Sequence, residues 1–256
     1  MMIKNKKQGF TLAEVLIALT IIGVIAAITI PVFMRDVRKQ EIETRLEQTY
    51  SLLNNALTLA VAEHGAAHTW DEMKLTSDTN QTLPFFYKYL APHLNFLKEG
   101  NKYLVESFGY GAIYSPNGEV YISKDENISM AVLANGSSFV GMNAWQIYNK
   151  NDTSIKKIYS VQYYIDVNGT KKPNTLGRDV FPFNLILMDQ NPHFEMTGNR
   201  GVDLNKITNL KDATSFEYIL KPESELIEEC KDTGKFCGAL IQRNGWKVPE
   251  NYPIRI

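Results

Sequence analysis

The sequence predicts an α+β fold in which a long N-terminal α-helix packs on a mainly antiparallel β-sheet head domain. Two observations predict it. A stretch of helix-forming residues extends from Phe10 to His64, apolar at first and then amphipathic, and short runs of β-branched and aromatic residues separated by Asn-Gly turns follow it. The 256 residues are 44% hydrophobic and 21% charged, which argues against a disordered chain and against a multi-span membrane protein.

The first half of the expected helix is long enough to cross a membrane. Between residues 10 and 32 the only charged side chain is that of Glu14. A membrane-spanning helix needs about 20 predominantly apolar residues, and this stretch reaches that length. Gly23 and Pro31 interrupt the pattern, and proline removes one backbone hydrogen bond from a helix. We therefore expect a spanning helix with a kink near its end.

The second half of the expected helix, at residues 34–65, is amphipathic. Apolar side chains recur there at three- and four-residue spacing, which places them on one face of a helix. Gly65 is a typical C-terminal stop, because glycine adopts the left-handed conformation that ends many helices. A helix from Phe10 to His64 is about 80 Å long at 1.5 Å per residue. The predicted apolar face consists of Ile42, Leu46, Tyr50, Leu53, Leu57, Ala60 and Val61.

Residues 66–256 predict a head domain with many short strands. Asn117-Gly118 and Asn135-Gly136 each lie between two runs of strand-forming residues, and both dipeptides favour hairpin turns. Longer runs at 157–167 and 183–188 are rich in β-branched and aromatic residues, which strands prefer. The head is therefore predicted to contain an antiparallel sheet, packed on the amphipathic half of the helix.

A motif at the N-terminus gives the first indication of function. The sequence from Lys6 to Ala18 is KKQGFTLAEVLIA, in which Gly9 precedes Phe10 and Glu14 is the fifth residue counted from Phe10. An ordinary signal peptide has a shorter apolar core and a cleavage site after it. The pattern instead resembles the processing motif of type IV pilins and of the pseudopilins of type II secretion. This resemblance covers about a tenth of the chain and implies that the head forms a pilin-like roll.

The resemblance also implies how the chain is processed. A prepilin peptidase would remove the leader, residues 1–9, by cutting between Gly9 and Phe10, and the new amino group of Phe10 would be methylated. The precursor would cross the inner (cytoplasmic) membrane once through residues 10–33, with its basic leader inside, as the positive-inside rule favours. The head, residues 66–256, would be extracytoplasmic, in a filament in the periplasm or at the cell surface.

Glu14 and Pro31 are expected to serve assembly. The simplest role for Glu14 is to complement the positive end of the helix dipole, which is worth about 0.3–1 kcal/mol. The resemblance implies a second role, in which Glu14 pairs with the methylated amine of Phe10 in a neighbouring subunit. It also implies that the stretch ending at Pro31 can lose helicity on assembly, whereas the simplest reading of Pro31 is a kink.

Three side chains in the head could offer oxygen ligands to calcium: Asp166, Asn168 and Asp179. The resemblance supports this hypothesis, since some pseudopilins bind calcium in this part of the fold. Lys171 and Lys172 lie in the same loop, and their charge disfavours a cation. The alternative is an ordered loop in which Asp166 and Asn168 form side-chain-to-backbone turns. We favour this alternative and expect no metal or other cofactor.

The two cysteines, Cys230 and Cys237, lie seven residues apart near the C-terminus. Outside the cytoplasm they are expected to form a disulfide, and the resemblance implies the same, because pilins commonly fix their C-terminal region with such a bridge. A metal half-site is the alternative. The apolar run that begins at Gly238 predicts a final strand followed by an extended end.

The expected function is structural rather than enzymatic. No nucleophile, zinc or phosphate-loop motif is present in the sequence. The resemblance implies a subunit of a type IV pilus-like or type II secretion pseudopilus filament. Its partners would be the prepilin peptidase and methylase, other copies or sister pilins, and an inner-membrane assembly platform. The alternative is a minor or tip pilin that displays a binding module for DNA, a host ligand or secretion cargo, although the net charge of −1 does not favour nucleic acid.

Overall fold

The computed structural model describes residues 10–70, 85–97, 111–123, 131–149, 152–187, 191–202 and 218–256. The leader, with Gly9, lies outside the described residues. The chain divides into two compact units, of which one ends at Glu41 and the other is Ile42–Arg255. The helix α1 contributes to both units, and each is described by itself below.

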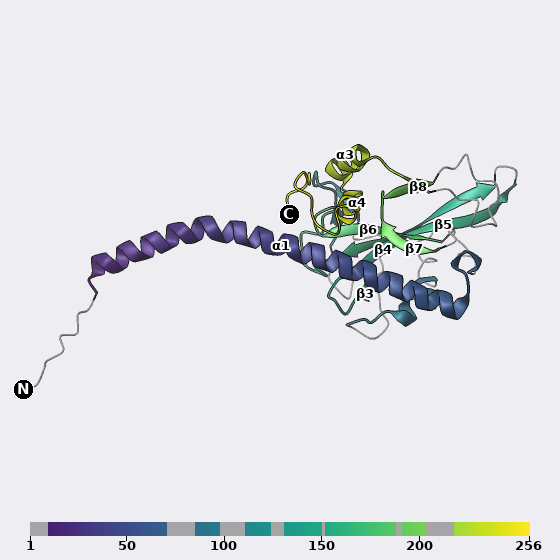
Figure 1. Cartoon of the computed structure of the whole chain (residues 1–256), viewed down its shortest axis with the longest axis horizontal. Helices are drawn as coiled ribbons and strands as arrows, with labels where there is room; N and C mark the ends of the chain where they lie inside the picture. The colour runs from purple at the N-terminus through teal and green to yellow at the C-terminus, as the bar shows by residue number, and fades with distance from the viewer. Residues whose placement is uncertain are drawn as a thin grey trace, which may run out of the picture. The chain divides into compact units, whose positions relative to one another are not determined.

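The helix α1 extends from Leu12 to His64 as one element of 53 residues (Figure 1). It passes through Pro31 without ending, since proline's missing N–H costs only one hydrogen bond. It stops at Gly65, which has a φ of +82° and donates its N–H to the carbonyl of Val61 at 2.9 Å. The predicted helix and its predicted stop are therefore confirmed.

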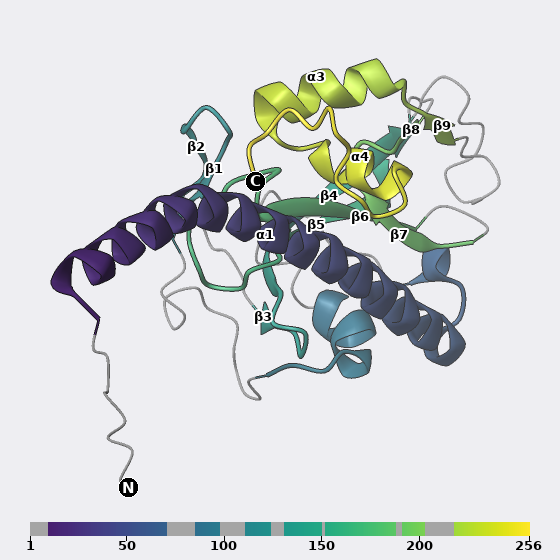
Figure 2. The same cartoon turned by 60° about the vertical axis from the view of Figure 1, so that its left-hand side comes forward.

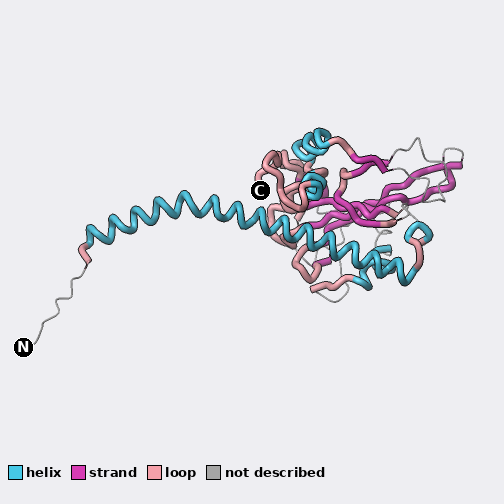
Figure 3. Tube along the Cα trace, viewed as in Figure 1, coloured by secondary structure: helices cyan, strands magenta, loops and turns pink. Residues whose placement is uncertain are grey.

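The described strands pair antiparallel, and Figure 3 shows them in magenta beside the helices in cyan, which confirms the predicted α+β class. The largest sheet has five strands in the order β3-β4-β5-β6-β7, so strands that follow each other in sequence lie side by side. The pairs β1-β2 and β8-β9 form two smaller sheets. Both predicted hairpins are present, with φ of +89° at Gly118 and +84° at Gly136. The strands are β1 (Ile113–Tyr114), β2 (Val120–Ile122), β3 (Ala131–Val132), β4 (Ser138–Asn149), β5 (Asp152–Asp166), β6 (Val180–Ile186), β7 (His193–Met196), β8 (Arg200–Val202) and β9 (Tyr218–Leu220).

Two helices near the C-terminus, α3 (Glu223–Thr233) and α4 (Cys237–Arg243), were not expected. The strand predicted from Gly238 is wrong, because these residues form α4. A Cβ on Gly238 would lie 1.8 Å from Cε of Met196, so α4 packs closely on β7, and a larger residue there would displace the Met196 side chain. A short run of apolar residues is compatible with either a buried strand or a buried helix, and the sequence pattern does not separate them.

The core of the second unit lies between α1 and the five-stranded sheet. In Figures 1 and 2 the part of α1 after Ile42 lies along this sheet. Arg45 Nη1 donates to the carbonyl of Val167 at 2.7 Å, and the fully buried Thr49 bonds to Asn135 Nδ2 at 3.0 Å. The buried apolar side chains of the helix are Ile42, Leu46, Leu53, Ala56, Leu57 and Ala60, and those of the sheet include Val161, Tyr163, Ile165, Phe181, Phe183, Leu185 and Phe194.

The C-terminal tail is fixed to α1 by a buried carboxylate. Glu43 is only 6% exposed, and its Oε1 accepts a hydrogen bond from the backbone N–H of Val248 at 2.9 Å. Its Oε2 lies 3.0 Å from Nζ of Lys247. The ring of Trp246 packs against that of Tyr50 on the same helix, with centroids 4.8 Å apart and the rings tilted by 44°. The tail is therefore held to α1 through two polar contacts of Glu43 and one aromatic contact.

Short helical turns follow α1 and pack beside its C-terminal end. The ring of Tyr89 lies 5.1 Å from that of His64 and 4.3 Å from that of Trp70. Trp70 Nε1 donates to the carbonyl of Gly65 at 2.9 Å, which satisfies one carbonyl at the helix end. These turns are η1 (Ala67–Thr69), η3 (Phe86–Leu90, a π-helical turn) and η4 (Ala91–His93).

Candidate processing and assembly site

The first turn of α1 is closed by Thr11 and Glu14. Thr11 immediately precedes the first helical residue, and Glu14 is the third residue of the helix. Glu14 Oε2 accepts hydrogen bonds from the backbone N–H of Thr11 at 2.8 Å and from its hydroxyl at 2.7 Å. In return, the N–H of Glu14 donates to Thr11 Oγ1 at 3.3 Å. This reciprocal pair is a capping box, which satisfies amide groups that the helix leaves without partners.

The residues after this cap form an apolar surface with no cover from the chain itself. The structure describes all of α1 and buries none of its most apolar stretch of 18 residues, which by length and composition can cross a membrane. Phe10 is 88% exposed. The hydroxyls of Thr20 and Thr29 donate to the carbonyls of Leu16 and Ile25, so the helix satisfies these polar groups without water.

Comparison with known proteins places this segment in a family context. Residues 4–30, which include Gly9, Phe10 and Glu14, match the model of the prokaryotic N-terminal methylation motif. Residues 32–256 match the model of a family of unknown function, DUF6613. The chain belongs to DUF6613. The match at 4–30 confirms the predicted kinship of this DUF6613 chain with type IV pilins and type II secretion pseudopilins.

One curated relative of this DUF6613 chain is named for its dependence on prepilin peptidase. Prepilin peptidase-dependent protein D of Escherichia coli (strain K12) is 36% identical to it over 67 residues. These residues are 26% of the chain and 45% of the relative, so the chain spans less than half the length of the curated relative that it matches. No solved structure matches the chain. The matches together identify a pilin- or pseudopilin-type protein.

The proposed calcium ligands lie close together at the end of β5. Asp166 Oδ1 accepts the N–H of Asn168 at 2.9 Å, which forms the side-chain-to-backbone turn expected as the alternative. Asp179 accepts bonds from Asn168 Nδ2 at 3.0 Å and from the N–H groups of Asn174 and Thr175 at 2.9 and 2.5 Å. Three N–H donors therefore surround this carboxylate in the DUF6613 head.

Two forces act on the charge of Asp179. Burial raises the pKa of its carboxyl group, while the bonds from Thr175, Asn174 and Asn168 and the charge of Arg178 oppose the rise. The Oδ1 atoms of Asn168 and Asn174 are buried and accept no hydrogen bond from the described residues. These oxygens are open to a water molecule or a cation, and calcium binding here stays a prediction.

Cys230 and Cys237 form a disulfide that joins α3 to α4. Their Cα atoms lie 4.5 Å apart, and both residues are fully buried. Between them Gly234, with a φ of +77°, is the C-cap of α3. Its N–H donates to the carbonyls of Cys230 and Glu229. Both sulfur atoms belong to this bond, and the bridge fixes the two unexpected helices to each other.

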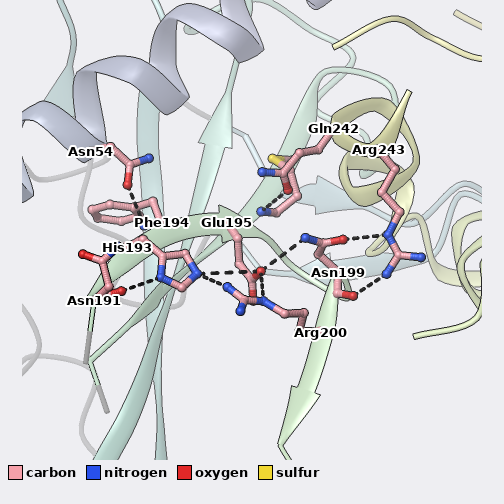
Figure 4. Close-up of polar contacts among 10 residues, drawn as sticks. Asn54, Asn191, His193, Phe194, Glu195, Asn199, Arg200, Gln242 and Arg243 are labelled. Carbon is pink, nitrogen blue, oxygen red and sulfur yellow. Dashed lines mark hydrogen bonds and ion pairs between the residues drawn. The ribbon is translucent and has the colours of Figure 1, made fainter. Parts of the chain in front are cut away.

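A polar network ties strand β7 to two helices, α1 and α4 (Figure 4). Asn54 on α1 accepts the N–H of Phe194 at 3.0 Å, and Gln242 on α4 accepts the N–H of Met196 at 3.0 Å. Both acceptors bond to β7, so the outermost strand of the sheet is held by two helices. The network therefore positions the edge of the sheet rather than a ligand.

The same figure shows a buried carboxylate at the centre of the network. Glu195 is 3% exposed and accepts bonds from Arg200 Nε at 2.8 Å and from Asn199 Nδ2 at 3.3 Å. Arg243 on α4 donates from Nε to Asn199 Oδ1 at 2.7 Å. His193 bonds to Arg200, and its Nδ1 contacts the carbonyl of Asn191 at 2.8 Å. These side chains satisfy one another and stabilise the junction of β7, β8 and α4.

The sequence patterns did not predict several of these contacts. The capping box has a sequence signature, Thr-x-x-Glu before an apolar run, which identifies Thr11 as the partner of Glu14. Glu43 has no such signature, because its partner Val248 lies 205 residues away. His64 and His93 also come together only in the fold, and the sequence shows them as isolated residues.

Proposed function

We propose that a prepilin peptidase cuts this chain between Gly9 and Phe10, and that the product assembles through residues 10–33 as a subunit of a type IV pilus-like or type II secretion pseudopilus filament. The observation that carries the proposal is the apolar first half of α1, which leaves its most apolar stretch unburied behind a methylation motif. Its partners would be other copies or sister pilins, gathered by an inner-membrane assembly platform. The role is structural.

The energetics of α1 support assembly. Burying apolar surface contributes about 25 cal/mol per Å², and the chain buries none of the large apolar side chains from Leu12 to Val37. Lipid covers this surface in the precursor. On leaving the membrane the helix needs an equally apolar environment, and neighbouring copies of the same helix supply one. Arg35, Arg38 and Lys39 flank the far end of the span, so charge alone gives the precursor only a weak orientation.

Cleavage creates the partner that Glu14 lacks in the membrane. A carboxylate at the bilayer centre costs about 2.5–3.5 kcal/mol, and less near the interface. Within the chain Glu14 bonds to Thr11, which supplies hydrogen bonds and no positive charge. The amine formed at Phe10 of a neighbouring subunit would supply that charge. An unpaired Glu14 then favours docking of the next subunit.

A second role rests on the head. Residues 32–256 have a family model separate from the methylation motif, and the relative from Escherichia coli matches only 26% of the chain. A head of its own family favours a minor or tip pilin that displays a binding module for DNA, a host ligand or secretion cargo. A bulk subunit should be abundant in sheared filaments, whereas a tip subunit should be scarce there.

The experiment that tests the proposal uses the full chain expressed with a prepilin peptidase and its assembly platform. We expect intact-mass analysis to show loss of residues 1–9 and gain of one methyl group, with N-terminal sequencing beginning at Phe10. We expect the sheared filament fraction to contain the trimmed chain. A chain that keeps its leader beside an active peptidase, or that stays in the membrane fraction alone, contradicts the proposal.

A further inference from the structure

Two histidines and a glutamate meet at the C-terminal end of α1. Glu63 and His64 are the last two residues of the helix, and His93 ends the short turn η4. Each side chain offers one ligand atom, and these three atoms all lie within 4.8 Å of one another. We propose that Glu63, His64 and His93 bind a divalent transition-metal ion of the Zn²⁺ class.

The distances suit a tetrahedral ion. Bonds of about 2.0–2.1 Å to zinc place neighbouring ligand atoms about 3.3–3.4 Å apart. Nε2 of His93 lies 3.4 Å from Oε2 of Glu63, and Nε2 of His64 lies 3.9 Å from Oε1 of Glu63. The side chain of Glu63 is 59% exposed. That side chain is therefore free to adjust its carboxylate to an ion, and side-chain adjustment of the three ligands is needed only within the 4.8 Å that separates their atoms at most.

The nitrogen of His93 has a further reason to bind a cation. The His93 side chain is 13% exposed, and its Nε2 atom is buried without a hydrogen bond to the described parts of the chain. A buried polar atom left unsatisfied costs about 1–3 kcal/mol. A metal ion removes this cost, whereas Glu63 alone approaches the nitrogen without hydrogen-bonding geometry.

The aromatic contacts hold His64 in place before any ion arrives. Its ring meets Tyr89 edge-on at 5.1 Å and Trp70 edge-on at 6.4 Å. Those two rings stack on each other with an interplanar angle of 5°, and Trp70 is bonded to the carbonyl of Gly65. A ligand fixed by packing loses little entropy when it binds, which raises its affinity for the ion.

Charge and ligand chemistry select the class of ion. The carbonyl end of a helix carries a partial negative charge, which favours a cation in its last turn. Two imidazoles and one carboxylate suit zinc and its neighbours, whereas calcium and magnesium prefer oxygen ligands alone. Three protein ligands leave one coordination position of a tetrahedral ion open. Because Glu63 is exposed, solvent water can reach the ion and fill that position.

The test titrates metal into the full-length chain in detergent micelles after treatment with a chelator. Co²⁺ serves as a spectroscopic probe, because tetrahedral Co²⁺ absorbs strongly in the visible range and octahedral Co²⁺ does not. We expect one Co²⁺ per chain with tetrahedral bands, and displacement of these bands by Zn²⁺. Zn²⁺ affinity is then measured by competition with a chromophoric chelator.

Matched variants connect the binding to these residues. We expect His64→Gln and His93→Gln each to lower Zn²⁺ affinity at least about tenfold, the minimum loss typical of perturbing a metal site. Glu63→Gln should lower it as well, and its exposed position leaves the fold intact. The control is His193→Gln, which removes a histidine from β7 and should bind Zn²⁺ like the wild type. Thermal melts without metal verify that each variant is folded.

Two results overturn the proposal. One is a wild-type chain that gives no tetrahedral Co²⁺ bands and holds Zn²⁺ no more tightly than the His64→Gln, His93→Gln double variant. The other is binding that Glu63→Gln and both single histidine variants leave unchanged. Either result would show that Glu63, His64 and His93 do not form a metal site. Neither result depends on whether the chain is processed or assembled.

Discussion

Thr11 and Glu14 hydrogen-bond each other in both directions across the first turn of α1, through contacts of 2.7, 2.8 and 3.3 Å. This relationship gives Glu14 a structural role inside its own chain, separate from a role between subunits. The two roles need different properties of the side chain. Capping needs an acceptor oxygen, which an amide also provides, whereas pairing with an amine needs the negative charge.

Glu14→Gln is expected to separate these roles. The glutamine keeps an oxygen for Thr11, so the helix start and the cleavage should stay intact. It removes the charge, and losing one partner of a buried ion pair costs about 2 kcal/mol or more per interface. We expect trimmed protein and little or no filament, measured by intact mass and by immunoblot of the sheared fraction.

Thr11→Val is the matched variant, because it removes the hydroxyl of the cap and keeps the charge of Glu14. Loss of an N-cap side chain costs about 1 kcal/mol, so filaments should still form. Normal filaments from Glu14→Gln would show that the charge has no part in assembly.

Gly9→Val is expected to leave an uncut precursor in the membrane, since a branched side chain before the cut obstructs the approach of the backbone to the protease. Intact mass should show residues 1–9 still attached. Gly23→Ala is a suitable control, because a Cβ at Gly23 meets no atom within 4 Å. We expect this control to be trimmed normally, and a trimmed Gly9→Val product would refute the assigned cleavage site.

Glu43→Ala is expected to destabilise the head by about 2–4 kcal/mol, because it leaves the buried N–H of Val248 without an acceptor and opens a gap beside it. Lys247→Ala removes the other partner, whose side chain is 64% exposed, and should cost less than about 1 kcal/mol. Denaturant unfolding of the two variants in detergent measures the difference. Equal losses would mean that the ion pair, and not the backbone bond, fixes the tail.

Removal of the disulfide by Cys230→Ala with Cys237→Ala is expected to lower stability by about 2.5 kcal/mol on the chain-entropy model for so short a loop. The same loss should appear when a reductant is added to the wild type. Thermal melts with and without reductant test this, and the double variant should then be insensitive to the reductant. An unchanged melting temperature would show that packing alone holds α3 and α4 together.

The sequence predicted the elements whose signals are local. The periodicity of Ile42, Leu46, Leu53 and Leu57 identified the buried face of α1, and the left-handed φ of Gly65 was predictable because few other residues adopt it. The two Asn-Gly turns identified the hairpins for the same reason.

What the sequence could not predict depends on contacts between distant residues. The apolar run from Gly238 forms a helix that packs against Met196, and no local pattern reports that contact. α3 is different, since Pro222 and the acidic residues Glu223 and Glu225 mark its start, and this signal was overlooked.

The structure describes all of α1, and the buried residues of this helix lie at Ile42 or beyond. The match to the methylation motif ends at residue 30, and the match to the DUF6613 model begins at residue 32. The two parts of this one helix therefore meet different physical requirements. Under the proposed function, substitutions before Glu41 would act through lipid and neighbouring subunits, whereas those from Ile42 onward would act through the stability of the head.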